Sequence, residues 1–353
     1  MALSTVTPAA RRTLSRAVVR PSWLAVGAAT LAVAAGSALD ASLPAAVVYA
    51  PFALSVVVLG LPHGAVDHLV PGRLGSGVTV RSMLWVGVVY AVLMGLYAGA
   101  WFLVPTASFV FFIALTWFHW GQGDVYALLA FDDAGHLPTT AERGLVLVVR
   151  GGLPMLAPLV AFPDQYRAVA LGVVSLFGAD AVALAPVFSP TGRLAAGGGL
   201  LALSILAVVL GGLRVRAGAP QEPWLVDTGE MALLWAFFAV VSPILAVGLY
   251  FCLWHALRHV ARLLLSTDVA ARALAAGDVW AALGRFARDA APLTAASLAV
   301  FVLLAIAVPN APGDRAGYLG LYLVGIAVLT LPHVAVVTWM DLRQGVWSAP
   351  GTR

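Results

Sequence analysis

Long apolar runs recur along the whole chain and constrain its fold more than any other feature. The fraction of charged residues is 10%, against about a quarter in soluble domains. Runs of about 17 to 25 apolar residues cross a bilayer as helices, which satisfy their own backbone hydrogen bonds. The sequence predicts an all-α, polytopic integral membrane bundle with about 8–10 transmembrane helices. The expected spans lie near 22–39, 44–70, 82–104, 106–130, 144–162, 166–188, 194–213, 229–265, 291–309 and 317–340.

Two segments leave the number of spans open. The run 229–265 is too long for one crossing and contains Ser242-Pro243, so it is either one kinked helix or two helices. The segment 266–290 carries several Asp and Arg residues, which favours a polar amphipathic helix or loop at the membrane surface.

The basic residues set the expected topology, and all of them are arginines. Four arginines precede the first run, which continues without a convincing signal-peptide cleavage site, so they predict a cytoplasmic N-terminus. We expect a basic cytoplasmic extension at 1–21, a single transmembrane domain at 22–342 and a C-terminal tail at 343–353. The protein should be a multi-pass protein of the plasma (cell) membrane. The arginines are dispersed, which argues against nucleic-acid binding.

Histidines carry the clearest sign of chemistry. The single cysteine, Cys252, excludes an internal disulfide framework and a cysteine-rich metal site, so any metal must bind nitrogen or oxygen. Ionisable groups at membrane depth are costly and are candidates for function, although a lone one can also join two helices. His136 lies in a loop, whereas the apolar runs or their ends contain His63, His68, His119, His255, His259 and His333.

His255 and His259 form the clearest local pair. Residues four apart lie about 40° apart on one helical face, so both imidazoles can hold the same ion. Such a pair can also be a packing or interfacial feature. Arg258 points away from that face, so it should either extend to the headgroups or pair with an Asp.

His63 is the favoured ligand of a second cluster. Asp67 follows it by one helical turn and could orient an imidazole through its other ring nitrogen. His68 points about 140° away from His63, so we do not expect these two histidines to bind one ion together, and an interfacial role for His68 remains open.

His119 and His333 are more ambiguous. Aromatic residues frame His119 near the end of a run that continues to Asp124, and aromatics are common at membrane interfaces. His333 follows Leu331-Pro332, as His63 follows Leu61-Pro62, and it could be a fifth ligand, a partner of a ligand or a packing residue. We take Asp67, Asp124 and His333 as candidates for positions beside the ligands.

The ligand type suits iron, with zinc, copper and manganese as alternatives. An apolar bundle core stores no water for hydrolysis, which favours oxygen chemistry. The zinc-peptidase signatures and the Gly-x-Ser-x-Gly nucleophile motif are absent from the sequence.

Together these motifs resemble the Brp/Blh family of membrane β-carotene oxygenases, and they extend over most of the chain. The resemblance implies cleavage of β-carotene by O2 at its central 15,15′ double bond, giving two all-trans retinal for a rhodopsin apoprotein as partner. It also implies Fe(2+) held at His63, His119, His255 and His259. Trp120 stands where a smaller aromatic is expected. The motifs are Pro62-His63-Gly64-Ala65 with Asp67-His68, Phe118-His119-Trp120-Gly121 with Asp124, Trp254-His255 with Arg258-His259, and Leu331-Pro332-His333.

A carotenoid is about as long as the hydrocarbon core is thick, so the substrate should enter from the lipid between helices. Aromatic residues could wall its tunnel, although ordinary packing explains each of them as well. They are Phe109, Phe111, Phe112, Trp117, Phe118, Trp120, Tyr250, Phe251, Trp254 and Trp339.

Three other functions compete with this interpretation. A di-iron lipid desaturase or hydroxylase would need more histidines than the seven present. A non-enzymatic carotenoid-binding or transport protein would bind no iron tightly and consume no O2. A haem protein with two histidine ligands would show a Soret absorption band.

Overall fold

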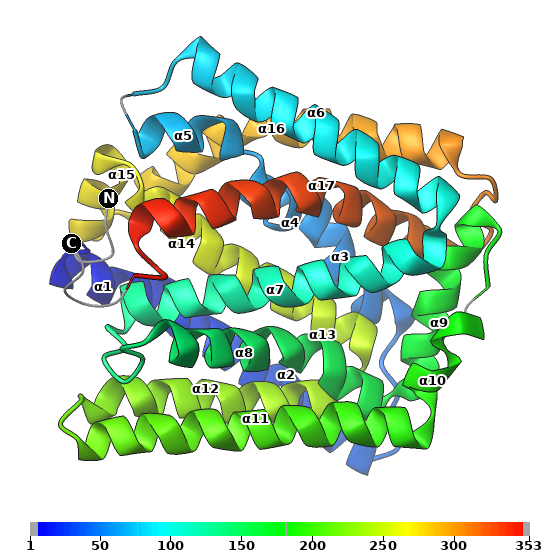
Figure 1. The fold of residues 1–353 in the computed structure, drawn as a ribbon, viewed down its shortest axis with the longest axis horizontal. Helices are drawn as coiled ribbons and strands as arrows, with labels where there is room; N and C mark the ends of the chain where they lie inside the picture. Colours follow the sequence, from blue (N-terminus) through cyan, green and yellow to red (C-terminus); the bar gives the residue numbers. More distant parts are fainter. Residues whose placement is uncertain (1–5, 76, 181, 349–353) are drawn as a thin grey trace.

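The structure, a computed structural model, describes residues 6–75, 77–180 and 182–348, and it contains no strand in these ranges. The long helices lie side by side, with α7 (Pro105–Phe131) and α17 (Arg315–Gln344) in the middle of the view in Figure 1. The predicted all-α class is confirmed. Residues 1–5 of the expected extension and 349–353 of the expected tail lie outside the described residues.

The lengths and compositions of the helices are those of a multi-pass membrane protein. Two further helices, α7 and α12 (Gln221–Val240), have the length of a span but bury polar side chains such as His119 and Glu230. Eight stretches of the described chain are long and apolar enough to cross a membrane: Pro8–Ala38, Ala45–Arg73, Val80–Leu103, Thr140–Ala161, Pro190–Arg216, Pro243–Leu265, Val279–Ala307 and Arg315–Gln344.

The first helix begins at Pro8, well before the span expected from residue 22. Thr7 caps it by accepting a hydrogen bond from the Ala10 backbone N at 3.2 Å. Ala10 and Leu14 recur at helical spacing among the arginines and are buried in the bundle. Much of the basic segment is therefore helical. The elements are α1 (Pro8–Leu14), a π-helical turn (Ser15–Val19) and α2 (Arg20–Ala38).

Proline and glycine break the apolar run 44–70, which the sequence pattern treats as one span. A Cβ on Gly60 would lie 2.7 Å from the Phe251 ring, so only glycine fits at this bend. The bend carries His63 and Asp67 into the bundle, where both are buried. The pieces are α3 (Ala45–Val57), α4 (Gly60–Gly64), a 3-10 turn (Asp67–Leu69) and α5 (Val70–Arg73).

Glycines bring α7 close to α8 (Thr140–Ala161). A Cβ on Gly151 would collide with the backbone oxygen of Trp117, and a Cβ on Gly121 would collide with that of Leu147. Small residues let two membrane helices approach closely. The preceding helix, α6 (Val80–Leu103), and α8 both begin at capping boxes.

The expected span 166–188 is wrong. Gly178 adopts the left-handed conformation with φ +74°, and Pro186 follows, so no single helix crosses here. The segment instead forms α9 (Pro163–Val174), a 3-10 turn (Ser175–Phe177), a second 3-10 turn (Val182–Leu184) and α10 (Ala185–Phe188), before the long α11 (Pro190–Arg216).

The run 229–265 is two helices, which was one of the two expected outcomes. α12 ends at Val240, and the next helix begins at Pro243. The segment 266–290 is helical, in α15 and the start of α16. The elements are α13 (Pro243–Tyr250), a π-helical turn (Phe251–Ala256), α14 (Leu257–Leu265), α15 (Asp268–Ala275) and α16 (Val279–Ala307).

Candidate metal centre

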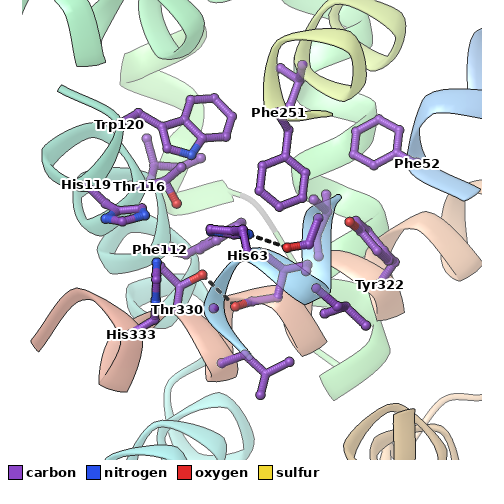
Figure 2. Close-up of a pocket in the computed structure, with 18 of the residues that line it drawn as sticks. Phe52, His63, Phe112, Thr116, His119, Trp120, Phe251, Tyr322, Thr330 and His333 are labelled. Atoms are coloured by element: carbon purple, nitrogen blue, oxygen red, sulfur yellow. Dashed lines mark hydrogen bonds between the residues drawn. The ribbon is translucent and has the colours of Figure 1, made fainter. Parts of the chain in front are cut away.

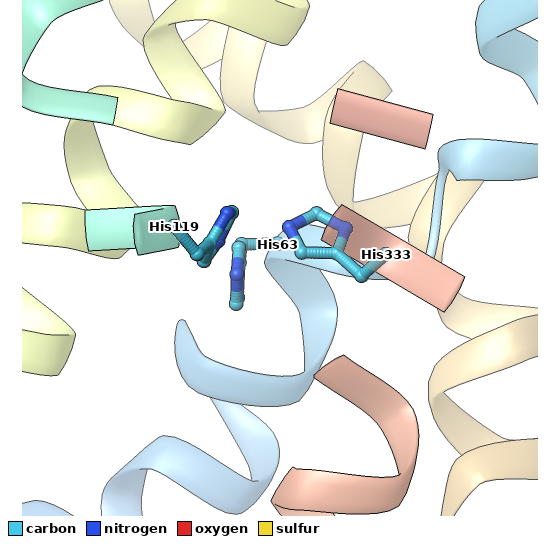
Figure 3. A group of neighbouring side chains, drawn as sticks. All are labelled: His63, His119 and His333. Carbon is cyan, nitrogen blue, oxygen red and sulfur yellow. The ribbon is translucent and has the colours of Figure 1, made fainter. Parts of the chain in front are cut away.

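Five buried histidines meet inside the bundle, from four separate regions of the sequence. The ring centroids of His119 and His255 are 4.6 Å apart, and those of His63 and His333 are 4.9 Å apart. His259 lies 5.0 Å from His333 by the same measure. Figure 3 shows three of the rings converging from α4, α7 and α17. The cluster contains all four predicted ligands and His333.

Local structure explains how the imidazoles come so close. His255 lies in the π-helical turn that precedes α14, and such turns often occur at functional sites. A Cβ on Gly123 would lie 3.2 Å from His255 Cε1, and one on Gly64 would lie 3.2 Å from His333 Nδ1. Both glycines leave room that a larger residue would take from the histidines.

Some ring nitrogens of these histidines have a hydrogen-bond partner in the described part of the chain and others do not. His63 Nδ1 contacts the Gly60 carbonyl oxygen, and His333 Nδ1 donates to Asp67 Oδ2 at 2.7 Å. Tyr90 also donates to Asp67 Oδ2, at 2.6 Å. Among the described residues, no hydrogen-bond partner exists for Nε2 of His63, His259 or His333. Each of these imidazoles therefore has an Nε2 that a ligand can engage.

This donor set fits a metal ion. His119 Nε2 and His255 Nε2 lie 3.0 Å apart. Two nitrogens bound to one ion at about 2.0–2.1 Å are separated by roughly 3 Å, so this spacing suits shared coordination. Ligand atoms of His63, His119 and His333 lie within 4.8 Å of one another, and so do those of Asp67, His259 and His333. His333 belongs to both groups, and its sequence signals were its place in an apolar run and the repeated Leu-Pro-His triplet.

An apolar cavity of about 280 Å³ lies beside the cluster. His63, His119 and His333 form part of its wall, as Figure 2 shows, and most of the remaining lining is aliphatic or aromatic. Of the aromatics expected around a tunnel, the lining includes Phe109, Phe112, Trp120 and Phe251. Phe111 and Phe118 are exposed on the outside of the bundle, and the lining does not include Trp117, Tyr250, Trp254 or Trp339.

Comparison with known proteins places the chain in a family. The sequence model of the family described as "Beta-carotene 15,15'-dioxygenase" matches residues 54–341. The chain belongs to this family. A Halobacterium salinarum protein named "Probable beta-carotene 15,15'-dioxygenase Blh" is 47% identical over 347 residues, which cover 98% of both chains. A second protein of that organism, with the same description and the name Brp, is 30% identical and also covers 98% of both chains. No solved structure matches.

In this member of the dioxygenase family, Arg258 pairs inside the bundle. The side chain is 4% exposed, so an extension to the headgroups is wrong. Its guanidinium donates to Glu230 at 2.5 Å and to Asp124 at 3.3 Å. The alternative expectation, an Asp partner for Arg258, is confirmed. It also lies 3.9 Å from the centre of the Trp254 ring. Arg258 therefore ties the helix that carries His255 and His259 to α7 and α12.

Asp124 takes part in a larger charge network. Arg150 is fully buried and contacts Asp124 at 3.5 Å, Asp227 at 2.5 Å and Glu230 at 2.9 Å. The Trp254 indole N–H also donates to Asp124, at 3.1 Å. The contacts of Asp124 are thus with Arg150, Arg258 and Trp254. The sequence analysis did not identify Arg150, Asp227 or Glu230 as part of the site. The one sequence feature that could have indicated them is that each is a charged residue within or near an apolar run.

The two remaining histidines lie outside the cluster. His136 is buried, and its Nε2 lies 3.1 Å from Asp227 Oδ2, at the edge of the charge network. His68 is half-buried in the 3-10 turn after α4. Neither belongs to a group of candidate metal ligands in the described part of the chain.

Proposed function

We propose that this protein cleaves β-carotene at its central 15,15′ double bond with O2, forming two molecules of all-trans retinal. The observation that carries the proposal is the cluster of buried histidines, with free Nε2 atoms, at the wall of an apolar cavity. The names of the Halobacterium relatives support the same reaction.

We propose Fe(2+) as the metal, held by His63, His119, His255 and His259. Imidazole suits iron among other first-row metals, and an oxygenase reaction requires a redox-active one. Bound ferrous iron would supply the electronic means for O2 to react with an alkene. His333, held by Asp67, presents its Nε2 to the same space and is positioned to complete the site.

The chain's own part in the reaction is placement. The cavity wall lays an apolar polyene against the histidines and excludes water, so the central double bond can be fixed beside the metal. The chain also contains no lysine. Lysine amines condense with aldehydes, so a retinal product has no side chain on which to become trapped as a Schiff base.

The orientation of the chain, its membrane and its partner are part of the proposal. We propose that residues 1–21 face the cytoplasm, that 22–342 form the membrane domain carrying the site, and that 343–353 are a tail. We further propose that the protein resides in the cell membrane and supplies retinal to a rhodopsin apoprotein. β-Carotene would enter from the lipid bilayer between helices.

Expression in a β-carotene-producing bacterial strain tests the reaction. Retinal and residual β-carotene are quantified by chromatography for the wild type, His259→Ala and the control His136→Ala. We expect retinal from the wild type and the control, and none from His259→Ala. Unchanged β-carotene with an iron-loaded wild type in the membrane would refute the proposed reaction.

A further inference from the structure

The hydroxyl of Thr116 is a buried polar group that the proposed metal site does not use. Thr116 lies on α7 one turn before His119, and it lines the cavity with a side chain that is 7% exposed. Among the described residues, its Oγ1 has no hydrogen-bond partner. Figure 2 shows the side chain beside the His119 ring, at the wall that His63 also lines.

Several other hydroxyls in the helices of this protein bind within their own helix. Those of Ser108, Tyr250 and Thr294 are also without a partner among the described residues, but unlike Thr116 these residues do not line the cavity. Thr30, Ser204 and Thr330 each donate to the backbone oxygen four residues earlier, at 2.8, 2.8 and 2.7 Å. This bond is the ordinary solution for a hydroxyl in a membrane helix. A buried donor left without any partner costs about 1–3 kcal/mol. The free Thr116 hydroxyl therefore points to a partner that is formed in the cavity during the reaction.

Three other hydroxyls along the cavity, those of Tyr90, Tyr322 and Thr330, already have partners. Tyr90 donates to Asp67, the Tyr322 hydroxyl lies 2.5 Å from that of Ser55, and Thr330 is bound within its helix. These groups cannot serve a ligand without losing a contact. Thr116 can, because its hydrogen is uncommitted.

We propose that Thr116 Oγ1 donates a hydrogen bond to the carbonyl oxygen formed when the central double bond is cleaved. The inference rests on the proposed function, because only that reaction introduces oxygen into an apolar hydrocarbon. A carbonyl oxygen only accepts hydrogen bonds, and a hydroxyl can donate one. The position of Thr116, one turn from His119, places the donor on the side of the cavity where oxygen reacts.

Two substitutions separate the hydroxyl from the shape of the side chain. Thr116→Val removes the hydroxyl and keeps the branched shape, whereas Thr116→Ser keeps the hydroxyl. All-trans retinal is added to iron-loaded proteins under nitrogen, and the carbonyl stretching frequency is measured by infrared spectroscopy. We expect a lowered frequency in the wild type and Thr116→Ser, and a return toward the value in an apolar solvent in Thr116→Val. Iron content equal to that of the wild type shows that each variant is folded.

Steady-state kinetics on the same proteins gives a second test. Loss of one hydrogen bond to the neutral carbonyl oxygen as it forms should lower kcat about 2- to 10-fold in Thr116→Val and change KM by less than about twofold. Thr30→Val is the matched control, because that hydroxyl is bound within its helix and the residue does not line the cavity. The same carbonyl frequency in all variants, or Thr116→Ser behaving as Thr116→Val, would overturn the assignment. Absence of retinal from the wild type would instead overturn the proposed function, and the assignment with it.

Discussion

Asp67→Asn tests whether the proposed metal centre depends on His333. Asp67 is 1% exposed, and its Oδ2 accepts hydrogen bonds from both His333 Nδ1 and Tyr90. A carboxylate accepts hydrogen bonds at two oxygens and donates none, whereas an asparagine amide has only one acceptor atom and two N–H donors. The variant can keep one acceptor oxygen toward His333 and Tyr90, but that oxygen no longer carries a negative charge. Its NH2 group takes the buried place of Asp67 Oδ1, which has no hydrogen-bond partner among the described residues.

The size of the effect follows from these contacts. One hydrogen bond to a charged acceptor contributes about 1.5–3 kcal/mol. Loss of the group that orients a metal-bound histidine typically lowers metal affinity about 10- to 100-fold, which equals about 1.4–2.7 kcal/mol. The two estimates agree. We expect Asp67→Asn to bind iron about 10- to 100-fold more weakly than the wild type.

Competition between the purified protein and a chromophoric chelator measures the iron affinity. Tyr90→Phe is the control, because it removes the other hydrogen bond and leaves the carboxylate on His333. We expect this control to lower affinity by less than about threefold. Wild-type affinity in Asp67→Asn, or an equal loss in Tyr90→Phe, would refute the argument that Asp67 acts through His333.

Three further predictions use other parts of the structure. Gly123→Ala places a Cβ 3.2 Å from His255 Cε1 and should lower iron content severalfold, whereas Gly144→Ala, which meets open space, should leave it unchanged in elemental analysis. Carotenoids with hydroxylated rings should show kcat/KM roughly 10-fold or more below that of β-carotene, since an unpaired buried hydroxyl costs about 1–3 kcal/mol; equal values would contradict the apolar lining. Burial raises the pKa of Asp132, in the loop after α7, to about 7 from 3.8, so the folded state binds this proton more tightly than the unfolded state. The stability that the protonated Asp132 contributes is therefore lost as the pH rises from the unfolded pKa of 3.8 to the folded pKa of about 7. Asp132→Asn does not titrate, so in detergent its melting temperature should fall less between about pH 5 and pH 7 than that of the wild type.

The fold class could be read from the sequence because bilayer thickness fixes the length of a span and lipid leaves backbone groups no other partner. The same logic fails where a run is apolar but broken. Gly60 bends the run 44–70, and Gly178 ends the helix inside 166–188. Hydropathy does not register these breaks, because glycine and proline change backbone geometry without making a segment polar.

Only the part of the candidate site that lies on one helix could be predicted from the sequence. Helical spacing places His255 and His259 on one face, and their cost in lipid marks them as functional. Spacing says nothing about which distant helix faces them. The position of His333 among the other imidazoles therefore required the structure, as did its bond to Asp67, which lies 266 residues earlier in the chain.

The buried charges beside the histidines fix the rotation of the helix that carries them. Arg258 lies between His255 and His259 in sequence and binds Glu230 on α12 and Asp124 on α7. Breaking such a buried pair by removing one partner costs about 3–5 kcal/mol, because the remaining charge is left without compensation. Rotating α14 would break these contacts together and would also turn both imidazoles away from the cluster. The network therefore gives the helix one favourable orientation, and that orientation is the one in which His255 and His259 face His63, His119 and His333.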